Sequence, residues 1–252
     1  MSIYYNDIDP YCCKVLRARI TDGLLPQGNV DENDIRSIPS DTLRGYRQLH
    51  LFAGIGGFPL GMRMAGFPED VSIITGGFPC QPHSMAGKRK GSGDERNLWP
   101  EFYRVIRDLR PQWVLAENVR GLLSSDDGRF FGGILRDLAH IGYDAEWQML
   151  SASAFGAPHE RERIFIIAYP CNKRLSRPVF RRASVCSTTL TSPTKFGNRI
   201  VPCGLWHQAH IGDIYMGNGV SAKVVRHGVK AMGNAVVPQI IAWIAQCIME
   251  SM

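Results

Sequence analysis

The sequence predicts an α/β protein with a doubly wound, mostly parallel sheet and a small irregular domain inserted into it. Short apolar runs rich in β-branched and aromatic residues alternate along the chain with segments of helical periodicity. These runs are apolar throughout, which is typical of strands covered on both faces of a sheet. From residue 171 the pattern gives way to Arg, Ser, Thr and Pro, and it returns near residue 231. A chain of 252 residues, 44% of them hydrophobic, is long enough to bury such a core.

Five strands and three helices follow from these patterns. The apolar runs predict strands over Ile3–Tyr5, Gln48–Phe52, Val71–Ile74, Trp113–Ala116 and Ile164–Ala168. Helical spacing of apolar residues predicts helices over Leu98–Leu109, over Phe130–Ile141 and after Pro238. We expect the last helix to cover one face of the sheet. A large domain of residues 1–170 and 231–252 would then enclose an inserted segment, residues 171–230.

Positive charge is concentrated in this inserted segment. Residues 171–230 contain ten Lys or Arg residues against one acid, Asp213, whereas the whole chain has a net charge of +6. The rest of the chain is therefore mildly acidic. A basic module on an acidic body is typical of proteins that bind a polyanion. A solvated charged surface explains the composition equally well.

Composition also speaks against several classes of protein. No stretch approaches the roughly 20 apolar residues of a membrane span, and the N-terminus carries acids where a signal peptide carries bases. Seven cysteines without a C-x-x-C pair favour a reduced compartment. Cys203, His207 and His210 lack a second ligand pair at zinc-finger spacing, so we expect no metal site. These observations predict a cytoplasmic protein with no membrane partner.

A glycine-rich loop follows the second predicted strand. The sequence FAGIGGF, residues 52–58, ends this strand and opens a helix, which is where open α/β sheets bind nucleotides. Pro59 rules out a G-x-G-x-x-G pattern. Glycines at this place would let a ligand approach the backbone closely, whereas a tight strand-to-helix turn would need only one of them.

A cysteine and an acid follow the next two strands. Cys80 lies between two nearby prolines in the loop GGFPCQP, and this rigid, exposed setting favours a nucleophile over a buried structural cysteine. Glu117 closes a very apolar strand, so partial desolvation should raise its pKa into the range of a proton donor. An exposed helix-capping acid is the alternative.

Two arginines precede the fifth predicted strand. Arg161 and Arg163 alternate in the run HERER, residues 159–163, so both side chains should reach the same face of the sheet. A surface run of ion pairs is the simpler interpretation.

Together these motifs resemble those of the bacterial and phage DNA (cytosine-5)-methyltransferases. FAGIGGF resembles that family's S-adenosylmethionine loop, GGFPCQP its nucleophile loop, ENV its catalytic acid motif, ERER its arginine motif and GNAVVPQ its closing motif. The resemblance covers residues 1–170 and 231–252. It implies a Rossmann-like fold of S-adenosylmethionine-dependent methyltransferases, and it places residues 171–230 in the position of the family's target recognition region.

The resemblance also implies the chemistry of cytosine methylation. Cys80 would add to C6 of a cytosine flipped out of the duplex, so that C5 can attack the methyl group of S-adenosylmethionine. Glu117 would protonate N3, Arg163 would contact the carbonyl oxygen of the base, and Arg161 would orient the site. The segment His83–Arg96 would close over the base.

The cofactor motifs occur in an unusual order. In the family, the strand and acid that hold the ribose and adenine follow the glycine-rich loop, but here the matching sequences, YNDIDPY and NDIRSI, precede it. The chain therefore resembles a circularly permuted member of the family, and we expect the strands of residues 1–36 to lie beside the strand Gln48–Phe52 in one sheet. A second departure is His159, which stands where the family has Gln.

Several cofactor contacts are implied by this resemblance. Asp7, in place of the family's Glu, would bind the ribose hydroxyls, Ile8 would stack on adenine, and Asp34 and Ile35 would contact the adenine edge. The remaining cofactor residues would be Phe52, Ala53, Gly54, Ile55, Gly56, Gly57, Pro79, Leu98, Asn234, Ala235 and Val236.

The predicted function is methylation of double-stranded DNA by a monomer, as in restriction-modification, with a cognate restriction endonuclease or with none. An RNA cytosine-5 methyltransferase and a catalytically silent DNA-binding module are the alternatives. The joint presence of Cys80, Glu117 and Arg163 argues against the silent module, which has no chemical need for all three. A nucleotide-binding oxidoreductase is weaker still, because it would need the G-x-G-x-x-G pattern.

Overall fold

A seven-stranded sheet forms the centre of the structure, a computed structural model that describes residues 3–79, 97–180, 195–196, 199–200 and 231–252. Its strands are β1 (Ile3–Asn6), β2 (Asn29–Asp31), β3 (Gln48–Leu51), β4 (Ile73–Gly76), β5 (Trp113–Val119), β6 (Tyr143–Ser151) and β7 (Glu162–Pro170). They lie in the order β2-β1-β3-β4-β5-β7-β6. Pairing is parallel from β2 through β5, and β7 is antiparallel to both of its neighbours. The predicted mostly parallel sheet is confirmed.

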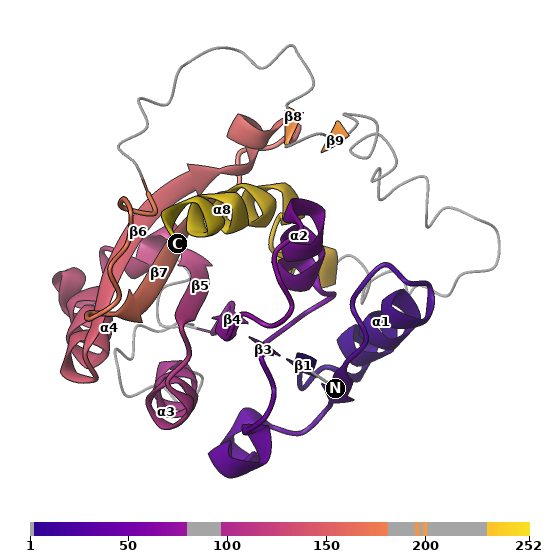
Figure 1. Ribbon diagram of the computed structural model, residues 1–252, viewed down its shortest axis with the longest axis horizontal. Coiled ribbons are helices and arrows are strands. Elements are labelled where there is room, and N and C mark those ends of the chain that lie inside the picture. The colour runs from indigo at the N-terminus through magenta and orange to yellow at the C-terminus, as the bar shows by residue number, and fades with distance from the viewer. Residues whose placement is uncertain (1–2, 80–96, 181–194, 197–198, 201–230) are drawn as a thin grey trace.

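Helices cover both faces of this sheet (Figure 1). They are α1 (Pro10–Thr21), α2 (Gly57–Ala65), α3 (Trp99–Leu109), α4 (Arg129–His140) and α8 (Pro238–Ser251). The short 3-10 turns are η1 (Ile35–Ser37), η2 (Ser40–Leu43), η5 (Arg120–Leu122), η6 (Ser125–Gly128) and η7 (Ala152–Phe155). Helices α1, α2 and α8 lie on one side and α3 and α4 on the other, which is the doubly wound arrangement. A separate pair, β8 (Lys195–Phe196) and β9 (Arg199–Ile200), lies within the inserted segment.

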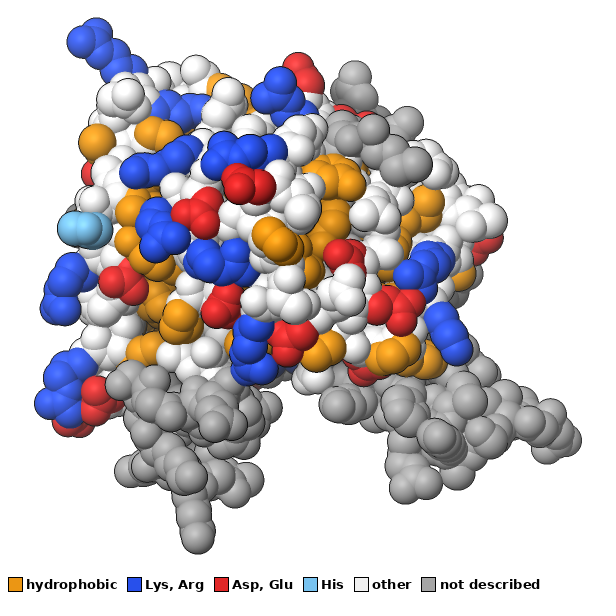
Figure 2. Space-filling view, turned by 90° about the horizontal axis from the view of Figure 1, so that it is seen from below, with side chains coloured by type: hydrophobic (Ala, Val, Ile, Leu, Met, Phe, Trp, Pro, Cys, Tyr) orange, Lys and Arg blue, Asp and Glu red, His pale blue; other side chains and the backbone are white. Residues whose placement is uncertain are grey.

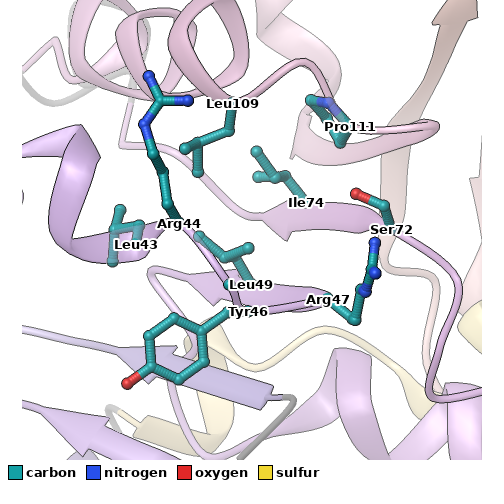
Figure 3. Close-up of a pocket in the computed structure, with 10 residues that line it drawn as sticks. Leu43, Arg44, Tyr46, Arg47, Leu49, Ser72, Ile74, Leu109 and Pro111 are labelled. Carbon is teal, nitrogen blue, oxygen red and sulfur yellow. The ribbon is translucent and has the colours of Figure 1, made fainter.

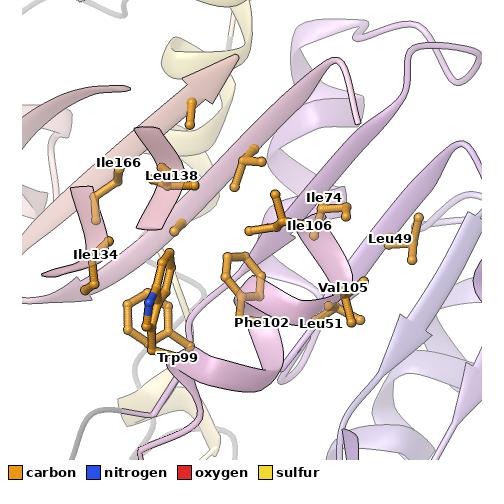
Figure 4. Close-up of a cluster of buried hydrophobic side chains, with 14 of the residues drawn as sticks. Leu49, Leu51, Ile74, Trp99, Phe102, Val105, Ile106, Ile134, Leu138 and Ile166 are labelled. Carbon is orange, nitrogen blue, oxygen red and sulfur yellow. The ribbon is translucent and has the colours of Figure 1, made fainter. Parts of the chain in front are cut away.

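The face under α3 and α4 has an aromatic and aliphatic core (Figure 4). Its buried side chains include Leu49, Leu51, Ile74, Trp99, Phe102, Val105, Ile106, Ile134, Leu138 and Ile166. The apolar positions of α3 recur at helical spacing, so one face of the helix is buried while its charged residues remain outside. The predicted helices at Leu98–Leu109 and Phe130–Ile141 are thus confirmed within one residue at each end.

Helix α8 covers the opposite face, as predicted. Ile240, Ile241, Ile244 and Ile248 are at most 1% exposed and pack against strand residues that include Trp113. The stretch Ala231–Ser251 is long and apolar enough to span a membrane by length and composition, so the expectation that no stretch has these properties was too strict. The buried inner side of α8 identifies it as a core helix of this domain.

Some elements differ from the prediction. Strand β4 begins at Ile73 and ends at Gly76, two residues later than expected, and β5 continues through Glu117 to Val119. Strands β2 and β6 and helix α1 were not predicted. Strand β2 has three residues, and β6 is an edge strand in which polar residues interrupt any apolar run. In α1 the buried face is formed partly by two cysteines within a polar sequence.

The N-terminal strands lie beside β3, although they precede it in sequence. Strand β1 pairs in parallel with β2 on one side and with β3 on the other, where Tyr5 aligns with His50. The connection from β2 to β3 packs on α3: Arg104 donates hydrogen bonds to Ser40 Oγ (2.7 Å) and to the carbonyl oxygen of Ile35 (2.9 Å). The expected neighbourhood of these strands is confirmed.

Candidate active site

Three parallel strands end in register at one edge of the sheet, where the fourth, β5, continues for three more residues. Asn6 of β1 aligns with Leu51 of β3, which aligns with Gly76 of β4. Gly76 in turn aligns with Ala116 of β5. The next residue along each strand is Asp7, Phe52, Gly77 or Glu117. Because parallel strands share one carboxyl edge, motifs that are far apart in the sequence meet there.

The glycine-rich loop after β3 needs more than one glycine. Gly54 and Gly56 have φ angles of 55° and 88°, in the left-handed region that favours glycine. A Cβ at Gly57 would lie 2.5 Å from Val236 Cγ1 and from the Val236 carbonyl oxygen, so the closing motif packs directly on this loop. A simple turn with a single required glycine is therefore the wrong interpretation.

Open space and an exposed apolar side chain lie beside this loop. A Cβ built at Gly54 would meet no atom of the described residues within 4 Å. Ile8 is 64% exposed, which is unusual for a large aliphatic side chain. An adenine ring and a ribose need an apolar surface and close backbone approach, so these residues fit a nucleoside-containing cofactor.

The Asp7 carboxylate links β1 to the glycine-rich loop. Oδ2 accepts a hydrogen bond from Gly54 N (2.7 Å) and Oδ1 accepts one from Asp9 N (2.9 Å). Burial raises the pKa of Asp7, and these hydrogen bonds oppose the rise. Farther along, Asp34 caps η1 by accepting from Arg36 N (2.9 Å), while Ile35 is only 3% exposed and belongs to the core.

Glu117 lies within β5 and is 8% exposed, so the alternative of an exposed capping acid is wrong. Burial raises the pKa of its carboxyl group, and the positive charges of Arg163 and Arg161 partly offset this effect. Arg163 Nε lies 3.0 Å from Glu117 Oε1, an ion pair whose angle falls short of a hydrogen bond. A Cβ at Gly77 would lie 3.1 Å from Glu117 Oε2, which explains the glycine there.

The two arginines have different partners. Arg163 faces Glu117, whereas Arg161 donates a hydrogen bond to the carbonyl oxygen of Gly233, at the start of the closing motif. Burial lowers the pKa of Arg161. The intervening Glu162 forms an exposed ion pair with Arg120 (2.7 Å). The interpretation as a surface run therefore holds for Glu162 and fails for Arg163.

Asn118 fixes the backbone that leads to Cys80. Its Nδ2 donates to the carbonyl oxygen of Phe78 (3.0 Å), and Leu98 N donates to the carbonyl oxygen of Pro79 (3.2 Å). The Phe78 ring is 2% exposed and packs against rings of α3. We did not single out Asn118 or Gly77 from the sequence, although both lie inside motifs that we recognised.

Other predicted site residues lie outside the described part of the chain. These are Cys80 and the segment His83–Arg96; Cys203, His207 and His210, which were not expected to bind a metal, lie outside it as well. Among the described residues, no group of three His, Cys, Asp or Glu side chains could hold a metal ion. Cys12 and Cys13 are buried, and Cys13 Sγ donates a hydrogen bond to the carbonyl oxygen of Asp7 (3.1 Å).

A cavity of about 380 Å³ lies at the opposite edge of the sheet (Figure 3). It is lined by residues before β3 and β4 and after α3, including Arg44, Tyr46, Arg47, Ser72 and Leu109. None of the predicted site residues that the structure describes lines it. The candidate active site is therefore the carboxyl edge, where Glu117 and Arg163 meet.

Comparison with known proteins gives a family match and related chains. The family model for C-5 cytosine-specific DNA methylases matches residues 66–195. The type II methyltransferase M.BanI of Aneurinibacillus aneurinilyticus is 46% identical over 105 residues, which cover 41% of this chain and 24% of that protein. The type II methyltransferase M1.ScrFI of Lactococcus lactis subsp. cremoris is 32% identical over 169 residues, which cover 67% of this chain and 35% of that protein. These alignments thus span about a quarter to a third of the length of the two relatives.

A solved structure has the same fold. The Entamoeba histolytica methyltransferase EhMeth superposes with a TM-score of 0.57 at 14% sequence identity, over 98% of this chain and 89% of that one. The Rossmann-like methyltransferase fold expected from the sequence is confirmed.

Proposed function

Because this chain belongs to the C-5 cytosine-specific DNA methylase family, we propose that it methylates C5 of cytosine in double-stranded DNA with S-adenosylmethionine as the donor. The observation that carries the proposal is the buried Glu117 carboxyl, paired with Arg163 beside the loop that leads to Cys80. Addition of a thiolate to cytosine needs a proton at N3 and positive charge near the carbonyl oxygen. A buried acid and a fixed arginine supply both.

The proposed reaction begins when the Cys80 thiolate forms a bond to C6 and Glu117 transfers its proton to N3. This makes C5 electron-rich. S-adenosylmethionine would supply the methyl group: C5 would bond to it as the methyl–sulfur bond breaks, and the sulfonium would become a neutral thioether. C5 then loses its proton to solvent, the bond to Cys80 breaks, and N3 returns its proton to Glu117. Arg163 lies against the base oxygen, and Arg161 braces this arrangement through Gly233.

The cofactor half of the site would be formed by the glycine-rich loop and the N-terminal strands. Ile8 offers an apolar surface for adenine, and Asp7 has lone pairs left for the ribose hydroxyls after bonding to Gly54 and Asp9. Asp34 and Ile35 would contact the adenine edge. The other members are Phe52, Ala53, Gly54, Ile55, Gly56, Gly57, Pro79, Leu98, Asn234, Ala235 and Val236.

Circular permutation explains how an N-terminal half-site can serve a loop that follows it. Strand β1 lies between β2 and β3 in the sheet, and Asp7 bonds directly to Gly54. Sheet packing depends on which strands meet and not on where the chain is cut. This part of the proposal rests on motif order and strand neighbourhood.

The basic segment, residues 171–230, would bind the DNA phosphates as a target recognition region. The face seen in Figure 2 supports this choice, because Lys and Arg side chains there are interspersed with acids. Several arginines of the described residues form ion pairs, such as Arg104 with Glu101 and Arg129 with Asp126. Paired charges of this kind give little net attraction for a polyanion. The proposed enzyme acts on DNA as a cytoplasmic monomer, with or without an endonuclease.

Bisulfite sequencing tests the proposed function. DNA from cells expressing the full chain should contain protected cytosines within one short sequence context, and DNA from cells expressing Cys80→Ala should contain none above background. Methyl transfer to RNA and not to DNA by the purified chain would instead favour the RNA methyltransferase. Protection that persists in Cys80→Ala would contradict the covalent mechanism.

A further inference from the structure

The carboxylate of Glu146, on the edge strand β6, accepts three hydrogen bonds from outside its own strand. Oε1 accepts from the Tyr169 hydroxyl (2.8 Å) and from Val179 N (3.1 Å), and Oε2 accepts from Phe180 N (2.9 Å). Two consecutive backbone N–H groups thus share one carboxylate. An ionised carboxylate has only acceptor sites, so it suits three converging donors.

The segment held by Glu146 is also packed onto the catalytic domain. Val179 is 2% exposed and belongs to the core under α8. The Phe180 ring stacks on Trp243 of α8, with centroids 6.1 Å apart. Ser176 Oγ donates to the carbonyl oxygen of Ser251 (3.1 Å) at the end of that helix. Residues 176–180 therefore form a fixed root.

The basic part of the inserted segment begins immediately after this root. Arg181 and Arg182 follow Phe180 directly, and residues 181–230 contain seven Lys or Arg residues against one acid. Three residues beyond the segment's last residue, the carbonyl oxygen of Gly233 accepts the hydrogen bond from Arg161. The described residues that flank the basic segment are therefore bound at two places, by Glu146 within β6 and by Arg161 just before β7.

Glu146 is separate from the catalytic acid and its arginine. In the pairing of β6 with β7, Glu146 lies opposite Ile167 and Leu150 lies opposite Arg163. Four residues at about 3.3 Å each place Glu146 roughly 13 Å along the strand from the Arg163 position. Any effect of Glu146 on methylation should therefore pass through the segment that it holds.

We propose that Glu146 is a positioning residue that sets where the basic segment leaves the catalytic domain, and thereby how tightly the enzyme holds DNA. This inference rests on the proposed function, because DNA is the ligand concerned. Fixing the root of the segment before binding lowers the conformational entropy lost when the segment meets phosphates.

Glu146→Gln tests this role with little change in shape. The amide replaces one oxygen with an NH₂ donor, so at least one of the three donors loses its acceptor. We expect the KM for duplex DNA to rise about tenfold, with kcat and S-adenosylmethionine affinity within about twofold of the wild-type values. Glu146→Asp keeps the charge but withdraws it by one methylene, and its KM should lie in between.

Tyr169→Phe is the matched control, because it removes one donor and leaves both backbone N–H groups bound to Glu146. Its KM for DNA should stay within about twofold of the wild-type value. Hydrogen exchange in free Glu146→Gln should be faster at the amides of residues 179 and 180 than in the wild type.

Three results would overturn the inference: unchanged exchange at these amides, faster exchange with an unchanged KM for DNA, or a fall in kcat at constant KM. A wild-type chain that methylates no DNA would count against the proposed function instead. The exchange measurement would still decide whether Glu146 holds the root.

Discussion

At the scale of single residues, burial controls the protonation of Glu117. The pKa of this carboxyl is raised, so it keeps its proton to higher pH than a solvated glutamate. Glu117→Gln should lower kcat by about 10²- to 10³-fold, because a positioned proton donor contributes on that order. Cofactor affinity, measured by calorimetry, should be nearly unchanged.

The pH dependence of kcat gives an independent check on Glu117. A proton donor is lost as pH rises through its pKa, so the wild-type rate should fall along that limb, and Glu117→Gln should lack it. A variant with the wild-type rate and pH profile would show that another group donates the proton.

Burial of His50 should make the free energy of unfolding depend on pH. This side chain is fully buried, its Nδ1 lies 2.8 Å from Thr75 Oγ1, and burial lowers its pKa to about 3. The unfolded chain binds a proton at this residue below about pH 6.5, and the folded chain does not until about pH 3. The contribution of His50 to stability is therefore complete above pH 6.5 and declines by about 1.4 kcal/mol per pH unit below it.

Urea unfolding at pH 7.5, 6 and 5 measures this effect. Other groups titrate in the same range, so the informative quantity is the difference between the wild type and His50→Gln, which lacks the imidazole. The free energy of unfolding of the wild type should fall more steeply toward pH 5 than that of the variant. Parallel curves would mean that His50 is not buried in its neutral form.

Which individual residues could be predicted depends on the range of their contacts. The position of Glu117 after an apolar run was enough to predict an acid with a raised pKa. The bond from Asn118 to Phe78 joins residues 40 positions apart, and the need for Gly77 comes from the carboxylate on a neighbouring strand. Such contacts depend on strand order, which local sequence patterns do not specify.

At the scale of elements, replacing two glycines in different helices by alanine should change the free energy of unfolding in opposite directions. In α2, a Cβ at Gly61 would lie 2.4 Å from the Pro238 carbonyl oxygen and 2.5 Å from Ile241 Cβ, so helix α8 would have to move. In α4, a Cβ at Gly132 would lie more than 4 Å from every atom that the structure describes outside its own turn of helix. We expect Gly61→Ala to lower the free energy of unfolding by about 1–3 kcal/mol and Gly132→Ala to raise it by about 0.5–1 kcal/mol.

Denaturant titration of the two variants measures both changes in the same assay. A Gly61→Ala protein as stable as the wild type would mean that α2 and α8 do not pack as closely as described. Gly132→Ala reports the intrinsic helix preference alone and serves as the reference.

The elements that were not predicted have local signals other than a continuous apolar run or an apolar helical face. Strand β6 forms the sheet edge, and its polar Asp144, Glu146 and Gln148 alternate with apolar residues, so it contains no continuous apolar run of the kind used to predict the other strands. Helix α1 begins with Asp9 accepting a hydrogen bond from Tyr11 N and with Pro10 in its first turn, a starting signal that the sequence analysis did not use. Apolar strands in the sheet interior were predicted correctly because burial on both faces leaves a continuous apolar run.

At the scale of the whole molecule, folding and cofactor binding should depend on which strands are neighbours in the sheet more than on their order along the chain. Moving residues 1–36 to follow Gly66 through short linkers would bring the cofactor motifs into the family's usual order. Because β1 already lies beside β3, we expect the rearranged chain to fold and to bind S-adenosylmethionine within about tenfold of the original affinity.

Circular dichroism and calorimetry test this rearrangement. A folded chain that no longer binds the cofactor would mean that the N-terminal strands do not supply the ribose and adenine contacts. Motif order allowed the strand neighbourhood to be predicted from the sequence, whereas the bond between Asp7 and Gly54 required the folded structure.

The central claim is that Cys80 bonds to C6 of cytosine in DNA. Duplex DNA in which cytosine is replaced by 5-fluorocytosine tests it. Fluorine replaces the C5 hydrogen that must leave as a proton, and since fluorine cannot leave as a cation, the bond to sulfur persists. With S-adenosylmethionine present, the account predicts a DNA–protein adduct that survives denaturing electrophoresis and maps by mass spectrometry to the peptide containing Cys80. An active preparation that forms no adduct, or forms it through another residue, would contradict the account.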